Sequence, residues 1–314
     1  MPRVKQPICV AVMTMVLMVV WVGCGCEERT PINPVPPPAT ATAPAEKPLP
    51  KIDATSIPLQ EPTPAFPGFA AGRIFRTDGK LIDDPSLRVE VLQTGLLDDS
   101  VNTKVSQPID ARPDGVYVGR LQPGTYQQPS ARIEFSYNKN QYRLPLTPRP
   151  PEAKRQDASE GVSQDFVWKL DGQRPGDRGD KLRPETWIGG SIYPEYRSFR
   201  PDLKRVVQAP PPGTKVIFTL IPKTPLPDGT QAKTRTAIRN YNATNTSLND
   251  GIIVDLPLAF WEVRGEEVFP DGSRSPLLFL LTEGAWADSV TGTFQADLAR
   301  SALKPVTVTF TRRE

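Results

Sequence analysis

The 314-residue chain contains no histidine, and its three cysteines, Cys9, Cys24 and Cys26, all lie near the start. Without histidine the chain lacks the commonest general base and the commonest neutral metal ligand. Beyond residue 26, neither an internal disulfide nor a thiolate metal site can form. A folded body in that part of the chain must therefore be held together by its apolar core.

The sequence also shows no long stretch of convincing helical periodicity and no concentration of positive charge. The chain has 37 prolines, and helix interiors tolerate proline badly, so we expect a chain of strands and turns. Lysine and arginine number 38 against 35 aspartates and glutamates, a net charge of +3. Nucleic-acid binding usually shows as a concentrated basic patch. We therefore expect no nucleic-acid partner.

The first residues have the pattern of an export signal. Arg3 and Lys5 precede an apolar run from Ile8 to Val22, which is shorter than the roughly 20 residues of a membrane-spanning helix. The run ends in Gly23-Cys24, which resembles the lipobox of bacterial lipoproteins, although Trp21 stands where leucine is usual.

This resemblance implies that residues 1–23 are removed and that Cys24 is acylated, with palmitate among the acyl groups. It predicts a protein anchored by lipid to a membrane of the bacterial cell envelope, on the exported side. A plain secretory signal and a short uncleaved anchor are the alternatives.

Residues 24–67 are rich in proline, including Pro36-Pro37-Pro38, and poor in large apolar side chains. Such a segment cannot bury enough apolar surface to fold. We expect a disordered linker that extends from the lipid anchor. At about 3.1 Å per residue it reaches on the order of 100 Å.

From Gly68 onward, apolar and polar residues alternate with period two. Residues 132–137, 142–146 and 306–311 follow this pattern, which is typical of half-buried antiparallel strands. Asp-Gly pairs recur between such runs, and these residues favour tight turns. A calcium site is the alternative for repeated aspartates, but none shows the ligand spacing of an EF-hand loop. The sequence predicts an all-β body with no metal and no cofactor.

Residues 112–126 contain two turns around a short strand. Asp114-Gly115 forms the first turn and Pro123-Gly124 the second, and Tyr126 follows as in the tyrosine corner of Greek-key proteins. The order of "GRIFRTDGKLIDD", "LRVEVLQ", "PDGVYVGRLQPGTY" and "ARIEFSYNKNQYRLPL" resembles the carboxypeptidase regulatory-like module. That resemblance implies an Ig-like, transthyretin-like β-sandwich over residues 68–172, closed by the strand "DFVWKL".

A faint internal repeat predicts a second domain. Asp250–Val254 aligns with Asp114–Val118, and the surrounding segments follow in similar order. We interpret residues 185–314 as a second, diverged β-sandwich, joined to the first by the linker 173–184. A chance similarity between two β segments is the alternative.

No catalytic motif is found in the sequence, so the predicted role is structural or protein-binding rather than enzymatic, with an envelope protein or a glycan as partner. One alternative is a glycan platform, because exposed aromatic side chains can stack on sugars. Another interpretation places these aromatic side chains in the core or in a contact between domains. A third, remote alternative is a hydrolase that uses carboxylates brought together from distant positions. The predicted platform residues are Trp187, Tyr193, Tyr196 and Phe199.

Overall fold

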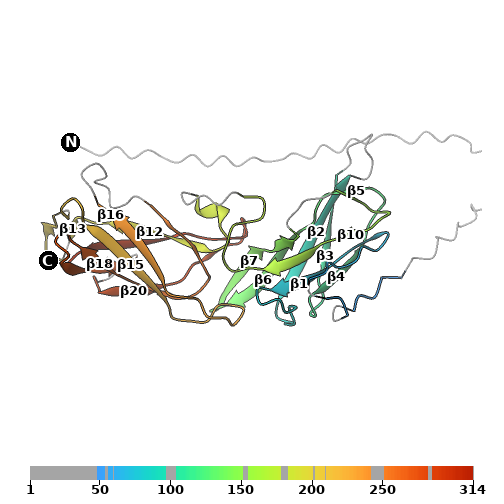
Figure 1. Ribbon diagram of the computed structural model, residues 1–314, viewed down its shortest axis with the longest axis horizontal. Coiled ribbons are helices and arrows are strands. Elements are labelled where there is room, and N and C mark those ends of the chain that lie inside the picture. Colours follow the sequence, from blue (N-terminus) through green and yellow to red (C-terminus); the bar gives the residue numbers. More distant parts are fainter. Residues whose placement is uncertain are drawn as a thin grey trace, which may run out of the picture. The chain divides into compact units, whose positions relative to one another are not determined.

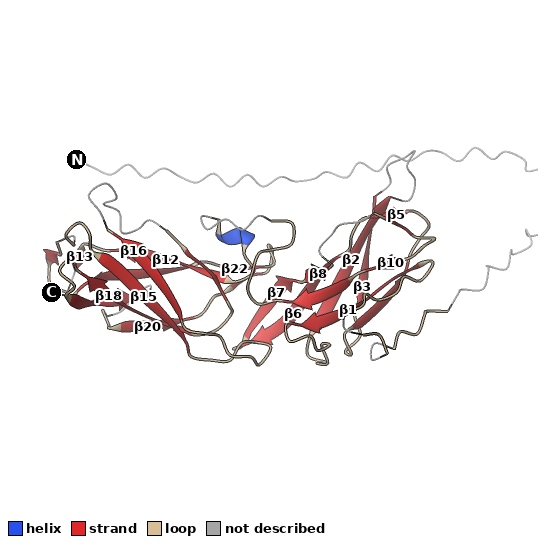
Figure 2. Ribbon diagram, viewed as in Figure 1, coloured by secondary structure: helices blue, strands red, loops and turns tan. Residues whose placement is uncertain are grey.

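The computed structural model describes residues 48–313, except 54–55, 59, 97–103, 151–154, 178–182, 201, 209, 242–250 and 282–284. The predicted signal segment, Cys24 and the linker up to residue 47 lie outside the described residues. Residues 48–314 form one compact unit. Strands make up almost all of its regular structure (Figure 2), so the prediction of an all-β body is confirmed. The one helical element among the described residues is a single 3-10 turn, Pro184–Thr186.

We call residues 48–172 the N-terminal region (Figure 1). Its strands alternate in burial as the sequence predicts; in β6, for example, Ile133 and Phe135 are buried between exposed or half-buried neighbours. The strands are β1 (Phe69–Arg76), β2 (Arg88–Leu96), β3 (Lys104–Asp110), β4 (Val116–Arg120), β5 (Thr125–Tyr126), β6 (Ser130–Tyr137), β7 (Asn140–Pro145), β8 (Thr147–Arg149), β9 (Gln156–Asp157), β10 (Val162–Ser163) and β11 (Asp165–Trp168).

These strands form two sheets that pack face to face. One sheet has the order β10-β1-β11-β8, with β4 beside β1. The other has the order β7-β6-β2-β5-β9, with β3 beside β2. The ring of Phe135 in one sheet lies 5.2 Å from that of Trp168 in the other. The apolar faces of both sheets thus share one core.

The described residues between 52 and 66 form a strap that packs on the N-terminal region ahead of β1. Ile52 is buried in a small apolar cluster with Ala71 and Val116. The sequence placed this segment in the disordered linker 24–67. That prediction is wrong for this segment, because it combines apolar burial with hydrogen bonds to β1 and β11. The folded region begins near residue 52 rather than at residue 68.

We call residues 173–313 the C-terminal region. Its strands are β12 (Gly190–Tyr196), β13 (Phe199–Arg200), β14 (Arg205–Val206), β15 (Lys215–Pro222), β16 (Arg235–Asn240), β17 (Ile253–Leu256), β18 (Trp261–Val268), β19 (Arg274–Leu280), β20 (Ser289–Gly292), β21 (Ala296–Asp297), β22 (Ala302–Leu303) and β23 (Val306–Arg312). Most of them belong to one sheet of order β16-β15-β18-β19-β23-β12-β17, with β20 beside β18.

This sheet curls around its own core. β15 and β23 are separated by two strands in the sheet order, yet the rings of Phe218 and Phe310 lie 5.1 Å apart. Arg239 of β16 reaches across to the carbonyl oxygens of Pro194 and Gly251, near the other end of the sheet. The C-terminal region is therefore a near-barrel, whereas the sequence predicted a second copy of the two-sheet arrangement.

The two regions contact each other directly beside the predicted linker 173–184. Gln173 forms a β-bridge with Trp187, and the Tyr142 hydroxyl of β7 donates to the Phe294 carbonyl at 2.8 Å. The Tyr137 hydroxyl donates to the Pro225 carbonyl at 2.7 Å. These bonds connect the two regions.

Candidate functional site

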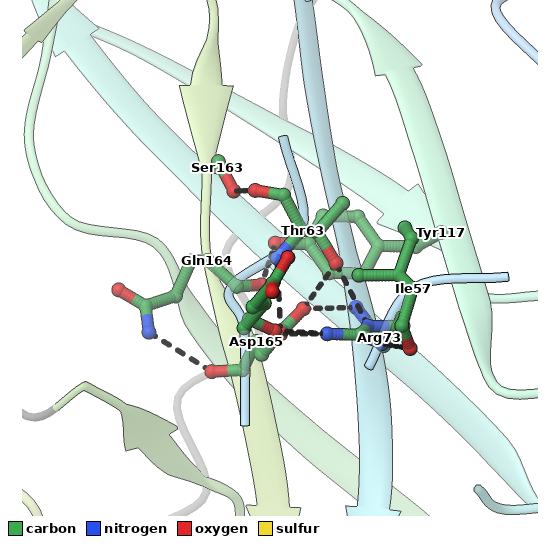
Figure 3. Close-up of polar contacts among 8 residues, drawn as sticks. Ile57, Thr63, Arg73, Tyr117, Ser163, Gln164 and Asp165 are labelled. Atoms are coloured by element: carbon green, nitrogen blue, oxygen red, sulfur yellow. Dashed lines mark hydrogen bonds and ion pairs between the residues drawn. The ribbon is translucent and has the colours of Figure 1, made fainter. Parts of the chain in front are cut away.

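A buried ion pair lies under the strap of the N-terminal region (Figure 3). The Arg73 guanidinium, which is 0% exposed, lies 3.1 Å from the Asp165 carboxylate. It also donates to the carbonyl oxygens of Ile57 and Glu61 in the strap. The Thr63 hydroxyl donates to Asp165 at 2.5 Å, and the backbone N–H groups of Thr63 and Arg73 donate to the same carboxylate.

This cluster is structural rather than reactive. Both oxygens of Asp165 accept hydrogen bonds, and the arginine is paired at each end. Beside it, burial raises the pKa of Tyr117, with a smaller contribution from the Asp165 charge. The Tyr117 hydroxyl donates to the Gln164 carbonyl at 2.6 Å. Every polar group of the cluster has a partner, so its physical role is to fix the strap to the sheet.

The predicted turn and corner residues lie in the N-terminal region. Gly115 has φ of 75°, and an Asp114 oxygen accepts the N–H of Val116 at 3.2 Å. Pro123 and Gly124 lead into Tyr126, which is fully buried and donates from its hydroxyl to the Gln122 carbonyl at 2.9 Å. This is the hydrogen bond that a tyrosine corner requires.

The four predicted platform residues do not share one face. Tyr193 and Tyr196 lie three residues apart on β12 and therefore point to opposite sides. The Tyr196 ring packs 5.6 Å from the core residue Phe310, whereas Tyr193 is 38% exposed. Trp187 is half-buried beside the bridge to Gln173. Phe199 is exposed on the separate strand β13.

The C-terminal region has a split in its curled sheet. β18 pairs with β15 along one edge, while its other edge is shared by β19 and β20. β19 leaves β18 after Pro276 and pairs with β23, but only through Thr309–Arg312. No described strand lies beside residues 306–308 of β23 on that side, or beside the outer edge of β20.

The backbone of Thr307 faces this split. The N–H of Arg197 donates to the carbonyl of Phe310 at 2.9 Å in the parallel pairing of β12 with β23. Backbone groups along a strand alternate in direction, so the even-numbered residues of β23 bond to β12. The N–H and C=O groups of Thr307 consequently point toward β20.

A groove of about 490 Å³ occupies this position, and we call it the β20–β23 groove. Its rim is polar and includes Glu195, Arg197 and Lys304. Its apolar lining residues include Leu281, Pro305 and Val306. Leu281 and Val306 also line a small core cavity of about 10 Å³, together with Ile192, Trp261, Val263, Val290 and Val308.

A second buried carboxylate lies in the C-terminal region, on β18. Glu267 is 1% exposed, and one of its oxygens accepts the Arg312 Nε–H at 2.8 Å. Its other oxygen has no hydrogen-bond partner among the described residues. Burial raises the pKa of Glu267, and the bond from Arg312 opposes this shift.

The sequence analysis missed the groove, the Arg73–Asp165 pair and Glu267. Arg73 does stand out as a charged residue within the apolar segment "GFAAGRIF". No such signal in the sequence points to residues 289–292, which form β20 beside the groove. No group of three or more histidine, cysteine or acidic residues within the described part could hold a metal ion. None of its helices is long and apolar enough to cross a membrane.

Comparisons with known proteins do not identify a family. No family model matches the chain, and no curated protein matches its sequence. A solved structure, the C-terminal fragment of the pilus adhesin SpaC from Lactobacillus rhamnosus GG, is similar at 9% identity and a TM-score of 0.23. The match covers 77% of this chain and 95% of that fragment. At this level, the likeness carries no functional argument.

Proposed function

We propose that this protein is a non-enzymatic lipoprotein of the bacterial cell envelope that binds a partner protein. Residues 1–23 are its signal, and the lipid on Cys24 is its membrane anchor. The N-terminal region is an Ig-like, transthyretin-like sandwich, and the C-terminal region is a near-barrel. The β20–β23 groove is the binding site, and its occupant is an extended segment of the partner.

The observation that carries this proposal is the pair of strand edges that flank the groove. Thr307 presents its backbone N–H and C=O there, and the outer edge of β20 lies opposite. An extended peptide adds to such edges through main-chain hydrogen bonds, while pockets for alternate side chains supply specificity.

The lining indicates the chemistry of the partner segment. An apolar side chain suits the part of the groove that Leu281, Pro305 and Val306 line. Arg197 and Lys304 outnumber Glu195 on the rim, so acidic residues beside the apolar one suit the segment. Among the described residues, Glu195 is the one acid that lines the groove, whereas hydrolysis by a carboxylate pair requires two.

The experiment is selection of peptides from a displayed random library on residues 48–314, followed by affinity measurements on two variants of one residue. Thr307→Pro removes the backbone N–H that faces the groove, while the bonds between β12 and β23 use the even-numbered residues. Thr307→Val keeps this N–H and serves as the matched control. We expect Thr307→Pro to weaken peptide affinity by about tenfold and Thr307→Val to leave it nearly unchanged.

Two results would count against the proposal. One is that no peptide is enriched on the wild-type protein. The other is that Thr307→Pro binds the selected peptides as tightly as Thr307→Val does. Thermal unfolding of both variants shows whether the sheet is intact.

The lipid anchor has its own test. In bacteria grown with an alkynyl palmitate analogue, the wild-type chain is expected to incorporate the label and Cys24→Ser to lack it. Equal labelling of both chains would contradict the assignment of Cys24. This test does not involve the groove, so the two parts of the proposal can fail separately.

A further inference from the structure

The hairpin β13–β14 exposes an unusual concentration of apolar side chains. Phe199, Leu203 and Val206 are 48%, 43% and 66% exposed. Phe199 and Val206 are direct partners across the two strands, so their side chains lie on the same face. The other large exposed apolar residues of the described chain, such as Ile238 and Leu298, lie outside this hairpin.

The base of the hairpin is firmly held. Arg200 is 7% exposed, donates to the Asp202 carboxylate and lies 6.0 Å above the Trp286 ring. Val207 is 1% exposed, and its N–H donates to the Ser198 carbonyl at 2.6 Å. A hairpin with buried anchors on either side presents its apolar residues outward in a fixed geometry. Their exposure is therefore a property of the fold.

Basic residues outnumber acidic residues in the segment that contains the hairpin. Residues 196–208 contain four basic side chains and one acid, Asp202, which is paired with Arg200. The others are Arg197, Lys204 and Arg205, of which Arg205 pairs with Arg200 across the hairpin. Lys204 lies at the turn with φ of 52° and is exposed.

We propose that the β13–β14 hairpin docks on the surface of an anionic phospholipid bilayer. Basic residues near such a surface are attracted to its negative headgroups, while apolar side chains enter the boundary between headgroups and acyl chains. The half-buried Trp286 beside the hairpin has the amphipathic ring that favours this boundary. A protein interface fits less well, because lysine is depleted in such interfaces.

The test is co-sedimentation of residues 48–314 with vesicles of equal parts phosphatidylcholine and phosphatidylglycerol, and with vesicles of phosphatidylcholine alone. This fragment contains the whole compact unit and lacks Cys24, so its binding does not depend on the lipid anchor. Phe199→Ser with Leu203→Ser removes the apolar contribution, and Lys204→Glu reverses one charge. Ile238→Ser, at a site 59% exposed on β16, is the matched control.

The wild type and Ile238→Ser are expected to bind the anionic vesicles and to bind pure phosphatidylcholine weakly. Lys204→Glu should reduce anionic binding by at least about fivefold, and the double variant should abolish it. Thermal unfolding of each variant identifies any loss that comes from misfolding. Photo-crosslinking from a diazirine side chain at position 203 provides a local readout, with position 298 as its control.

Three results would overturn the proposal. The first is a wild type that does not bind anionic vesicles. The second is a double variant that binds as well as the wild type. The third is equal lipid crosslinking from positions 203 and 298. If the wild type ignores vesicles but the double variant loses a protein captured from envelope extracts, the hairpin is a protein-binding site instead. None of these results bears on the β20–β23 groove.

Discussion

The two β regions enclose their cores in different ways. In the N-terminal region, two sheets face each other, and a strap is fixed across one sheet by the Arg73–Asp165 pair. In the C-terminal region, a single sheet curls until Arg239 bridges strands from its two ends. The first arrangement covers a sheet with an added segment. The second leaves strand edges beside the β20–β23 groove, where we propose that another chain binds.

The largest expected loss of stability comes from breaking the buried Arg73–Asp165 pair, which fixes the strap of the N-terminal region. Arg73→Leu leaves the Asp165 carboxylate buried without its cation and releases the strap. We expect a loss of about 3 to 5 kcal/mol in the free energy of unfolding, measured by urea denaturation of residues 48–314. Arg88→Leu is the control, because Arg88 pairs with Asp110 at the surface of the same region. Similar losses in both variants would contradict a special role for the buried pair.

The second-largest expected effect is a difference in stability between alanine substitutions at two glycines, one tightly packed and one with more space. A Cβ added to Gly72 would lie 1.9 Å from the Gln164 carbonyl oxygen, a backbone atom. A Cβ added to Gly292 would lie 3.1 Å from the end of the Leu281 side chain, which can shift. We expect Gly72→Ala to lower the free energy of unfolding by about 3 kcal/mol, and Gly292→Ala by under about 1 kcal/mol. Equal melting temperatures for the two variants would contradict the expected difference in packing around Gly72 and Gly292.

The smallest expected effect is a pH dependence in the C-terminal region. Burial raises the pKa of Glu267 above its ordinary value of 4.5, so the folded state binds this proton more tightly than the unfolded state. The resulting stabilisation is fully present below pH 4.5 and is lost as the pH rises through the raised folded pKa.

Glu267→Gln cannot titrate at this position. The stability of the wild type relative to Glu267→Gln should therefore fall as the pH rises from below 4.5 toward neutrality. Urea denaturation at a series of pH values measures this difference. A difference that stays constant or rises with pH would show that the carboxylate is not destabilised by burial.

Much of the fold could be predicted from the sequence, because alternation and turns are local. The period-two pattern of residues 306–311 predicts the strand that the structure contains, and Asp114-Gly115 predicts a turn. Strand partners are not encoded locally. The parallel pairing of β12 with β23 joins residues more than a hundred positions apart, so the near-barrel and its groove could not be foreseen. The strap was missed because its proline content outweighed its few buried residues.

Amide hydrogen exchange of residues 48–314 in the absence of any partner tests the central claim most directly. The account predicts fast exchange at Thr307, whose N–H faces the β20–β23 groove. It predicts slow exchange at Ile133, in the middle of β6 between β2 and β7, and slowing at Thr307 when a selected peptide is added. An amide of Thr307 as well protected as that of Ile133 in the free protein would show that the groove has no free strand edge.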